Sequence, residues 1–189
     1  MKSEQEKRLR RGSTLLLIVD VQQKLLPAIH DAEQVEKNCV LLARAARQLG
    51  IPMVITEQNP SRLGSTAASL REVAGEFKAI EKMSFSACAA VPGGSTLDAI
   101  QASGRDTILL CGVEAHVCVL QTALDLVDAE YSVFVARDAI SSRTPENAQI
   151  GWERMMRAGV LPTSTESAIF EWLETAGTPD FKALLPFLK

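Results

Sequence analysis

Residues 106–125, DTILLCGVEAHVCVLQTALD, join a strand pattern directly to a helix pattern. Residues 106–111 form a short apolar run with branched side chains, bounded by Gly104 and Gly112, which is typical of a buried strand. Apolar residues then recur at helical spacing, at positions 117, 120, 124 and 127. We therefore predict a strand, a tight turn and a helix, with Cys118 near the first turn of that helix.

The position of Cys118 makes it a candidate nucleophile. The unpaired N–H groups and partial positive charge at the start of a helix favour a thiolate over a thiol. A free thiol is only a few per cent ionised at neutral pH, and lowering its pKa by about 1.5 units requires about 2 kcal/mol of differential stabilisation. A helix end and one nearby cation could supply this. A lone cysteine on a helix is more often a small buried hydrophobic residue, so position alone does not establish catalysis.

Length and composition favour one globular domain. The chain has 189 residues, of which 47% are hydrophobic and 23% are charged, as is usual for globular proteins. The net charge of −3 argues against a broad nucleic-acid-binding surface, which would be basic. No apolar run approaches the roughly 20 residues of a membrane helix. We therefore expect neither nucleic acid nor a membrane as a partner.

Residues 1–13 are charged, and we expect them to form an N-terminal tail ahead of a single domain over residues 14–189. The apolar run that begins at Leu15 is too short for a secretory signal and ends at Asp20. The four cysteines form no CxxC pair and match no zinc spacing. Free cysteines fit best with a reducing cytoplasm.

Strand and helix patterns alternate along the chain. The expected strands are 14–19, 52–56, 77–80, 106–111, 131–136 and 160–163. The expected helices are 31–49, 66–74, 95–102, the helix that carries Cys118, 145–158, 164–173 and 179–188. This alternation predicts a three-layer α/β/α fold, with one six-stranded parallel sheet in the order 3-2-1-4-5-6 and helices on both faces.

Three ionisable side chains follow strands at one edge of this sheet. Asp20 follows the first strand, Lys82 follows the third, and Cys118 comes one turn after the fourth. Sites in open parallel sheets form beyond the carboxyl ends of the strands, and neighbouring strands lie about 4.8 Å apart. We therefore expect these side chains to meet. Alone, Asp20 could be an ordinary capping residue and Lys82 a solvated charge, so only the combination indicates a site.

Four motifs stand at the expected strand ends, and each is weak by itself. They are residues 20–22 (DVQ), 56–58 (TEQ), 81–86 (EKMSFS) and 112–118 (GVEAHVC). In this order they resemble the isochorismatase-like cysteine hydrolase superfamily, and most closely its isochorismatase-domain-containing branch. The similarity runs from about Thr14 to Leu173. It implies the isochorismatase-like hydrolase fold.

The resemblance also implies an Asp-Lys-Cys catalytic triad. Asp20 matches the residue that accepts and relays the thiol proton, Lys82 matches the lysine that stabilises charge and orients the aspartate, and Cys118 matches the nucleophile. The implied reaction is cleavage of a small amide or related acyl substrate through a Cys acyl-enzyme, which water then releases. A lysine about 4 Å from the thiolate would contribute about 4 kcal/mol at an effective dielectric constant near 20, more than the lowered thiol pKa requires.

Further site residues follow from the same resemblance. The family's oxyanion hole uses two backbone N–H groups, which correspond here to those of Cys118 and Glu114. A non-proline cis bond aims the second donor in the family, and it corresponds to the bond from Val113 to Glu114. Such donors are worth a few kcal/mol of barrier each. Gln23 and Phe85 are candidate substrate-binding walls of the pocket.

Two differences between this sequence and members of the superfamily disfavour particular activities. Nicotinamidases of this superfamily carry a metal site with an Asp-x-His pair and a further His, but residues 57–64 contain no histidine. We therefore expect no metal and no cofactor, and nicotinamidase activity is disfavoured. Isochorismatases lack the nucleophilic cysteine and cleave a vinyl ether, so the presence of Cys118 disfavours that reaction as well.

Several alternatives stay open. A catalytically silent binding or scaffold protein with this fold is the main alternative to a hydrolase. A His116–Cys118 dyad is disfavoured, because positions two apart on a helix face different ways. Cys88 could line the pocket or be a buried structural thiol. Members of the family are commonly oligomeric, and the apolar run 183–188 is consistent with a homo-oligomer. Dinucleotide binding is disfavoured because no GxGxxG follows the first strand.

Overall fold

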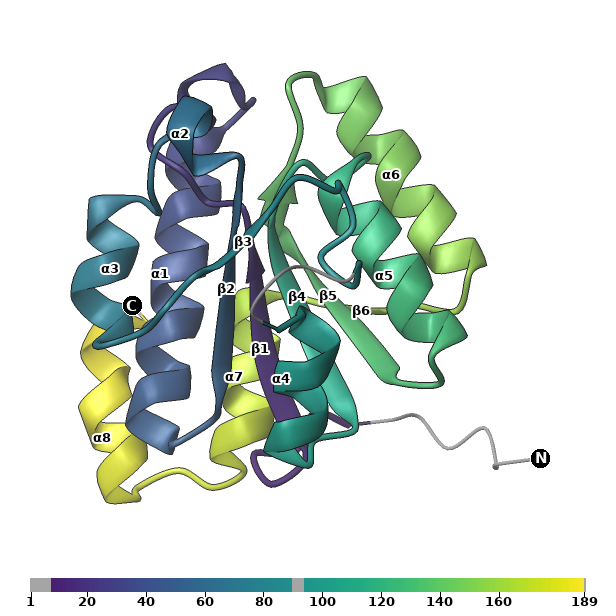
Figure 1. The fold of residues 1–189 in the computed structure, drawn as a ribbon. Coiled ribbons are helices and arrows are strands. Elements are labelled where there is room, and N and C mark those ends of the chain that lie inside the picture. The colour runs from purple at the N-terminus through teal and green to yellow at the C-terminus, as the bar shows by residue number, and fades with distance from the viewer. Residues whose placement is uncertain (1–7, 90–93, 189) are drawn as a thin grey trace.

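A six-stranded parallel sheet forms the centre of the computed structural model, which describes residues 8–89 and 94–188 (Figure 1). The strand order is β3-β2-β1-β4-β5-β6, and every neighbouring pair is parallel. The strands are β1 (Thr14–Val19), β2 (Met53–Gln58), β3 (Ile80–Lys82), β4 (Thr107–Val113), β5 (Ser132–Ser141) and β6 (Leu161–Thr163). The predicted fold class and strand order are confirmed.

The central strand β1 shows why the sheet sits between two layers. All six of its residues are buried, as expected for a parallel strand that is covered on both faces. Leu16 and Ile18 join one hydrophobic cluster, whereas Leu15 and Leu17 join the other. Successive side chains of a strand point to opposite faces, so one continuous apolar run supplies both cores.

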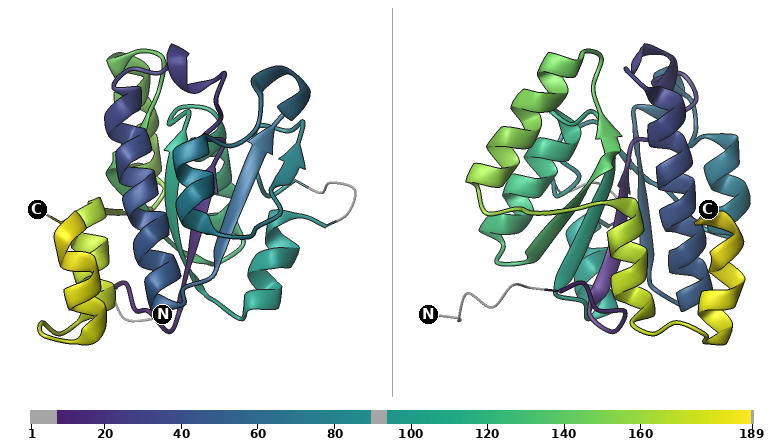
Figure 2. Two further views of the ribbon diagram at one scale, coloured as in Figure 1. Left: turned by 90° about the vertical axis from the view of Figure 1, so that its left-hand side faces the viewer. Right: turned by 180° about the vertical axis from the view of Figure 1, so that it is seen from behind.

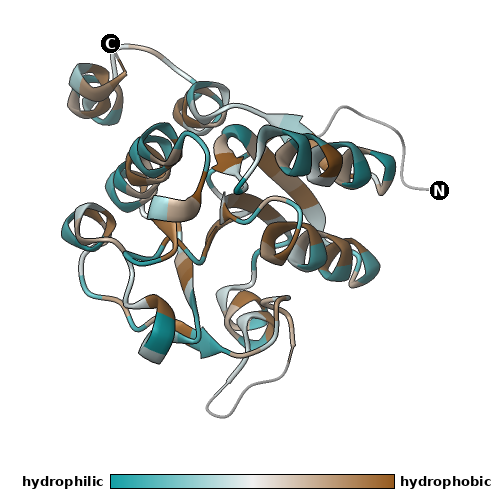
Figure 3. Cartoon of the chain, turned by 90° about the horizontal axis from the view of Figure 1, so that it is seen from above, coloured by the Kyte–Doolittle hydropathy of each residue, from teal (hydrophilic) through white to brown (hydrophobic). Residues whose placement is uncertain are grey.

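Helices cover the two faces of the sheet. One face packs against α1 (Ala32–Leu49), α3 (Ala68–Ala74), α7 (Thr165–Leu173) and α8 (Pro179–Leu184). The other packs against α4 (Thr96–Ser103), α5 (Cys118–Asp128) and α6 (Pro145–Arg157). Shorter elements are α2 (Pro60–Leu63) and the 3₁₀ turns η1 (Leu26–Ala28) and η2 (Leu185–Phe187). Seen from behind, α7 and α8 lie beside α1 (Figure 2), and hydrophobic residues colour the central strands (Figure 3).

Two strands differ most from the predicted ranges. The third strand was expected at 77–80, but β3 covers Ile80–Lys82, where Glu81 pairs with Glu57 and Lys82 with Gln58. The apolar pattern missed this strand because two of its three residues are charged. Strand β5 extends to Ser141, since its pairing with β4 shifts register near Gly112 and then resumes.

Part of the predicted N-terminal tail packs against the domain. Leu9 is fully buried, and its backbone N–H donates to Oε2 of Glu171 at 2.6 Å. Arg11 forms an ion pair with Asp180 of α8 at 2.9 Å. Residues 1–7 lie outside the described residues, so the boundary at residue 14 stays a prediction. Within the described ranges, no helix combines the length and apolar character that a membrane span requires.

Candidate active site

A buried ion pair joins the ends of β1 and β3. Nζ of Lys82 lies 2.6 Å from Oδ2 of Asp20, and the two side chains are 1% and 0% exposed. Asp20 follows β1 with a φ of 53°, in the left-handed region, which aspartate tolerates better than most residues. Lys82 is the last residue of β3. Because β2 lies between these strands, the pair spans the carboxyl edge of three neighbouring strands.

Hydrogen-bond acceptors surround the ammonium group of Lys82. Besides Asp20, Nζ donates to Oε1 of Gln58 at 3.0 Å and to the carbonyl oxygens of Ser84 and Phe85 at 3.3 and 3.1 Å. Four acceptors thus share the three N–H bonds of one ammonium. These contacts replace water around a charge that would otherwise be costly to bury.

Cys118 is the first residue of α5 and lies against the same ion pair. The residue is 5% exposed, and its thiol lies near enough to Asp20 and Lys82 for both charges to affect its pKa. Burial, and then the negative charge of Asp20, raise the pKa of the Cys118 thiol to about 12, and this outweighs the opposing effect of Lys82. The expectation that the site lowers this pKa is wrong, because burial and the carboxylate of Asp20 outweigh the charge of Lys82.

The turn before Cys118 brings a backbone N–H near its sulfur. The peptide bond between Val113 and Glu114 is cis, and the Glu114 backbone lies near enough to the Cys118 thiol to lower its pKa. The turn is fixed on its outer side, where Nε of Arg143 lies 3.0 Å from Oε2 of Glu114. Its next residue, Ala115, donates its N–H to the carbonyl of Ser141 at 2.7 Å. A carbonyl that approaches the sulfur would therefore meet the Glu114 N–H.

Comparisons with known proteins show which family the chain belongs to. Residues 14–167 match the model of the Isochorismatase domain. The chain belongs to the isochorismatase family. The secreted isochorismatase effector Isc1 of Phytophthora sojae is 39% identical over 185 residues, which are 96% of this chain and 87% of that protein. Membership in this family supports a hydrolase-like function.

Solved structures of relatives share the whole fold of this isochorismatase-family chain. The MAR1 ribonuclease from Caenorhabditis elegans superposes with a TM-score of 0.88 at 32% identity, covering 96% of this chain and 92% of that one. YcaC from Pseudomonas aeruginosa, solved with hexane-2,5-diol and covalent acrylamide, superposes with a TM-score of 0.89 at 25% identity. It covers 98% of this chain and 93% of its own.

The loop after β3 is tied to the middle of α5. The hydroxyl of Ser86 donates to Asp125, and the N–H of Ala87 donates to Oγ1 of Thr122 at 2.9 Å. The hydroxyl of Thr122 in turn donates to the carbonyl of Cys118 at 2.6 Å. These contacts hold the strand that carries Lys82 and the helix that carries Cys118 in one arrangement.

The sequence left the roles of His116 and Cys88 open, and the structure shows what each side chain contacts. Nδ1 of His116 lies 2.9 Å from Oγ of Ser142, so the imidazole is engaged with that hydroxyl. Cys88 packs in the same hydrophobic cluster as Cys118, with its thiol 3.8 Å from the carbonyl of Thr122. Burial, and then Asp125, raise the pKa of Cys88 to about 12. Both observations favour structural roles.

The two predicted substrate-binding residues lie at the surface. Gln23 is exposed, and its backbone N–H donates to the carbonyl of Ser65 at 3.0 Å. The side chain of Phe85 is 55% exposed, although its carbonyl contacts Lys82. Their contact with a substrate stays a prediction.

Thr56 and Gln58 contact the ion pair, but no role was derived for them from the sequence. Thr56 donates its hydroxyl to Asp20 at 2.7 Å, and Gln58 accepts from Lys82 at 3.0 Å. Both belong to the TEQ motif and stand two positions apart on β2. Strand β2 lies between β1 and β3, and alternate residues of a strand face the same side. This alternation was the signal that could have indicated Thr56 and Gln58.

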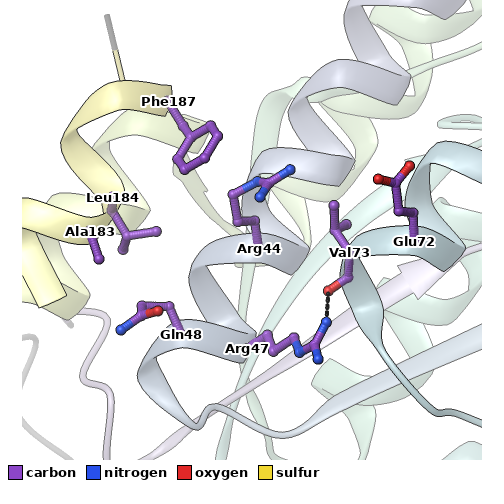
Figure 4. Close-up of a pocket in the computed structure, with 8 residues that line it drawn as sticks. All are labelled: Arg44, Arg47, Gln48, Glu72, Val73, Ala183, Leu184 and Phe187. Atoms are coloured by element: carbon purple, nitrogen blue, oxygen red, sulfur yellow. Dashed lines mark hydrogen bonds between the residues drawn. The ribbon is translucent and has the colours of Figure 1, made fainter.

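A cavity of about 400 Å³ lies away from the Asp20–Lys82 ion pair, between α1, α3 and the C-terminal elements (Figure 4). Its lining residues are Arg44, Arg47, Gln48, Glu72, Val73, Ala183, Leu184 and Phe187. None of them contacts the ion pair, so the chemistry rather than the cavity volume locates the candidate site. Within residues 8–89 and 94–188, no group of three or more His, Cys, Asp or Glu could hold a metal ion.

The raised thiol pKa leads to a prediction for Asp20→Asn. Because the charge of Asp20 raises the pKa of Cys118, its removal should lower that pKa and increase the thiolate fraction. A fall of about one unit would speed alkylation of Cys118 by iodoacetamide about tenfold at pH 7.5. In the wild type, with a pKa of about 12, the rate should climb steadily with pH and reach no plateau below pH 10. Peptide mapping by mass spectrometry separates Cys118 from the other cysteines.

Asp31→Asn is the matched control for this substitution. Asp31 also has a left-handed backbone, with a φ of 52°, but it is exposed and pairs with His30. Its replacement should leave the alkylation rate of Cys118 unchanged. If folded Asp20→Asn protein is alkylated more slowly than the wild type, Asp20 activates the resting thiol and the raised pKa is wrong.

Proposed function

We propose that the protein is a metal-independent cysteine hydrolase that cleaves a small amide or related acyl substrate through an acyl-enzyme on Cys118. The observation that carries this proposal is the buried Asp20–Lys82 ion pair, against which the thiol of Cys118 lies. A nucleophile, a base that contacts it and a fixed cation that orients the base form the arrangement that covalent acyl transfer requires.

The raised thiol pKa indicates when the proton moves. Ionising a group with a pKa of about 12 at pH 7 costs about 7 kcal/mol, so a free resting thiolate is disfavoured. The proton instead passes to Asp20 as the sulfur attacks the carbonyl carbon. Lys82 keeps its hydrogen bond to the carboxylate during this transfer. Asp20 is therefore the general base, and Lys82 the charge that orients it.

The remaining steps return each group to its starting state. The N–H groups of Glu114 and Cys118 stabilise the oxyanion of the tetrahedral intermediate. Asp20 then gives its proton to the departing amine or alcohol, which leaves a thioester on Cys118. Water attacks this thioester, Asp20 accepts a proton from the water, and the sulfur leaves and is reprotonated by Asp20 as the carboxylic acid departs.

Two relatives bear on this proposal. The P. aeruginosa YcaC structure is described with covalent acrylamide, an electrophile that is also a small amide, and this supports a reactive nucleophile in the shared fold. The C. elegans relative is described as a ribonuclease. The net charge of −3 on this chain is opposite to the basic balance that RNA binding favours, so we do not extend that description to it.

Assembly and location are also part of the proposal. We infer a homo-oligomer, because Phe170 and Phe187 at the C-terminal end are 43% and 46% exposed, and such apolar side chains often mark subunit contacts. Light scattering coupled to size exclusion tests this. We place the protein in the cytoplasm, because its four cysteines are free and buried. The P. sojae relative is described as secreted, so fractionation of the native protein should decide between the two locations.

Acylation of Cys118 is the test of the proposed reaction. When a panel of small amides and esters is incubated with the protein, mass spectrometry should detect an acyl group on Cys118 that disappears as product forms. Cys118→Ala should abolish the adduct. Cys88→Ala is the matched control, since that thiol is also buried and has a raised pKa. A wild-type protein that no panel member acylates would favour a catalytically silent binding protein.

A further inference from the structure

We propose that Thr56 and Gln58 are positioning residues, which aim the carboxylate of Asp20 and the ammonium of Lys82 toward the reacting thiol. This inference rests on the proposed function, because it concerns how the same ion pair is held. Neither side chain acts as the nucleophile or as a donor in the oxyanion hole. Both act through the two residues that they contact.

The sheet topology explains why these two positions reach the ion pair. Strand β2 lies between β1, which leads into Asp20, and β3, which ends at Lys82. In the parallel register Gln58 stands opposite Lys82. Alternate residues of a strand face the same side, so positions 56 and 58 point together. The residue between them, Glu57, accepts instead from the N–H and hydroxyl of Thr66.

Thr56 fixes one oxygen of the Asp20 carboxylate. Its hydroxyl donates to Oδ1 at 2.7 Å, while Lys82 donates to Oδ2 at 2.6 Å. The side chain of Thr56 is fully buried, and β-branching restricts its rotamer. The terminal torsion of an aspartate is broad, so a single donor would leave the carboxylate free to rotate. One donor on each oxygen restricts this rotation and leaves lone pairs for the thiol proton.

Gln58 fixes the ammonium of Lys82 in a similar way. Its Oε1 accepts from Nζ at 3.0 Å, and its Nε2 donates to the carbonyl of Met83 at 2.9 Å, so both ends of the amide are engaged. Its backbone is held by Gln22, whose side chain accepts from the N–H of Gln58 at 2.8 Å and donates to its carbonyl at 3.0 Å. Asp20 and Gln22 of the DVQ motif thus share one hydrogen-bond network with Lys82. Thr56 and Gln58 of the TEQ motif belong to the same network, whereas Glu57 does not.

The expected consequence is a loss of turnover rather than of binding. A misplacement of about 1 Å in a reacting group can reduce a rate by about 100-fold. Thr56→Val keeps the shape but removes the donor, and should lower kcat about 10- to 100-fold while KM changes less than about twofold. Thr56→Ser restores the donor and should recover most of kcat. Gln58→Met should lower kcat by only about tenfold, because Lys82 keeps three of its four acceptors.

Thr66→Val is the matched control for Thr56→Val. Thr66 is 1% exposed and also donates its hydroxyl to a buried carboxylate, that of Glu57, at 2.7 Å. Both valine variants should be destabilised to a similar extent, but only Thr56→Val should lower kcat. The kinetic readout is the part of p-nitrophenyl acetate hydrolysis that is lost in Cys118→Ala.

Alkylation of Cys118 by iodoacetamide supplies a second readout that needs no turnover. Since the fixed carboxylate of Asp20 raises the pKa of Cys118, its release in Thr56→Val should speed alkylation about threefold at pH 7.5. Thr66→Val should leave this rate unchanged. If wild type shows no hydrolysis dependent on Cys118 but Thr56→Val still speeds alkylation, the proposed function fails and the positioning role stands. If Thr56→Val and Thr66→Val match in both readouts, the positioning role is overturned.

Discussion

Replacement of Lys82 by methionine should abolish measurable turnover and lower the free energy of unfolding by about 3–5 kcal/mol. The ammonium of Lys82 is the cation that contacts the buried carboxylate of Asp20, at 2.6 Å. Its removal leaves an uncompensated negative charge in the core. The loss of Lys82 also removes the charge that opposes the rise in the Cys118 pKa, so the thiol should become still harder to ionise. We expect turnover to fall by at least about 10³-fold.

Urea unfolding and the hydrolysis of p-nitrophenyl acetate measure the two effects separately. Lys78→Met is a control in the same segment, because Lys78 is exposed and should change neither quantity by much. The double variant Lys82→Met with Asp20→Asn removes both charges. It should be more stable than Lys82→Met alone, because no unpaired charge remains, yet it should stay inactive. Substantial activity in folded Lys82→Met protein would exclude the lysine from the mechanism.

The convergence of this ion pair could be predicted because it follows from topology. Alternating strand and helix patterns define a doubly wound sheet, and its strand order places the ends of β1, β3 and β4 at one edge. Asp20, Lys82 and Cys118 follow or end those strands, so their meeting required no knowledge of packing. A prediction of this kind depends only on which side chains stand at which strand ends.

The ionisation of Cys118 could not be predicted in the same way. The sequence showed a helix start and a nearby lysine, and both lower the pKa of a thiol. It did not show that Cys118 would be only 5% exposed, or that the charge of Asp20 would affect the thiol pKa more than the charge of Lys82. Burial and contact direction are properties of the packed structure, and here they reverse the sign of the expected shift.

The partners of the ion pair were hidden for a related reason. The apolar pattern placed the third strand at 77–80, so the register that sets Gln58 opposite Lys82 was not available. Without that register, no contact with the ion pair could be predicted for Thr56 and Gln58, so their presence in the motif had no explanation. An edge strand of three residues with two charges carries too little hydrophobic signal to be positioned from sequence.

Gly112→Ala should prevent stable folding, with an expected loss of more than about 4 kcal/mol. Gly112 has a φ of 112°, and it lies where β4 passes close to β1. A Cβ atom at this position would stand 2.1 Å from the carbonyl oxygen of Val19 and 2.8 Å from its backbone nitrogen. Backbone atoms in the centre of a sheet cannot move aside as a flexible side chain can. The strands would have to separate at the residue that precedes Asp20.

Gly104→Ala separates this clash from ordinary backbone strain. Gly104 also has a positive φ, of 66°, but a Cβ atom there would meet nothing within 4 Å. Its replacement should cost about 1 kcal/mol, the usual price of a left-handed conformation. Urea unfolding midpoints of the two variants measure the difference. A Gly112→Ala protein as stable as Gly104→Ala would mean that β1 and β4 do not need this close approach. If it also kept its activity, the distance between Asp20 and Cys118 would not depend on having a glycine at position 112 of β4.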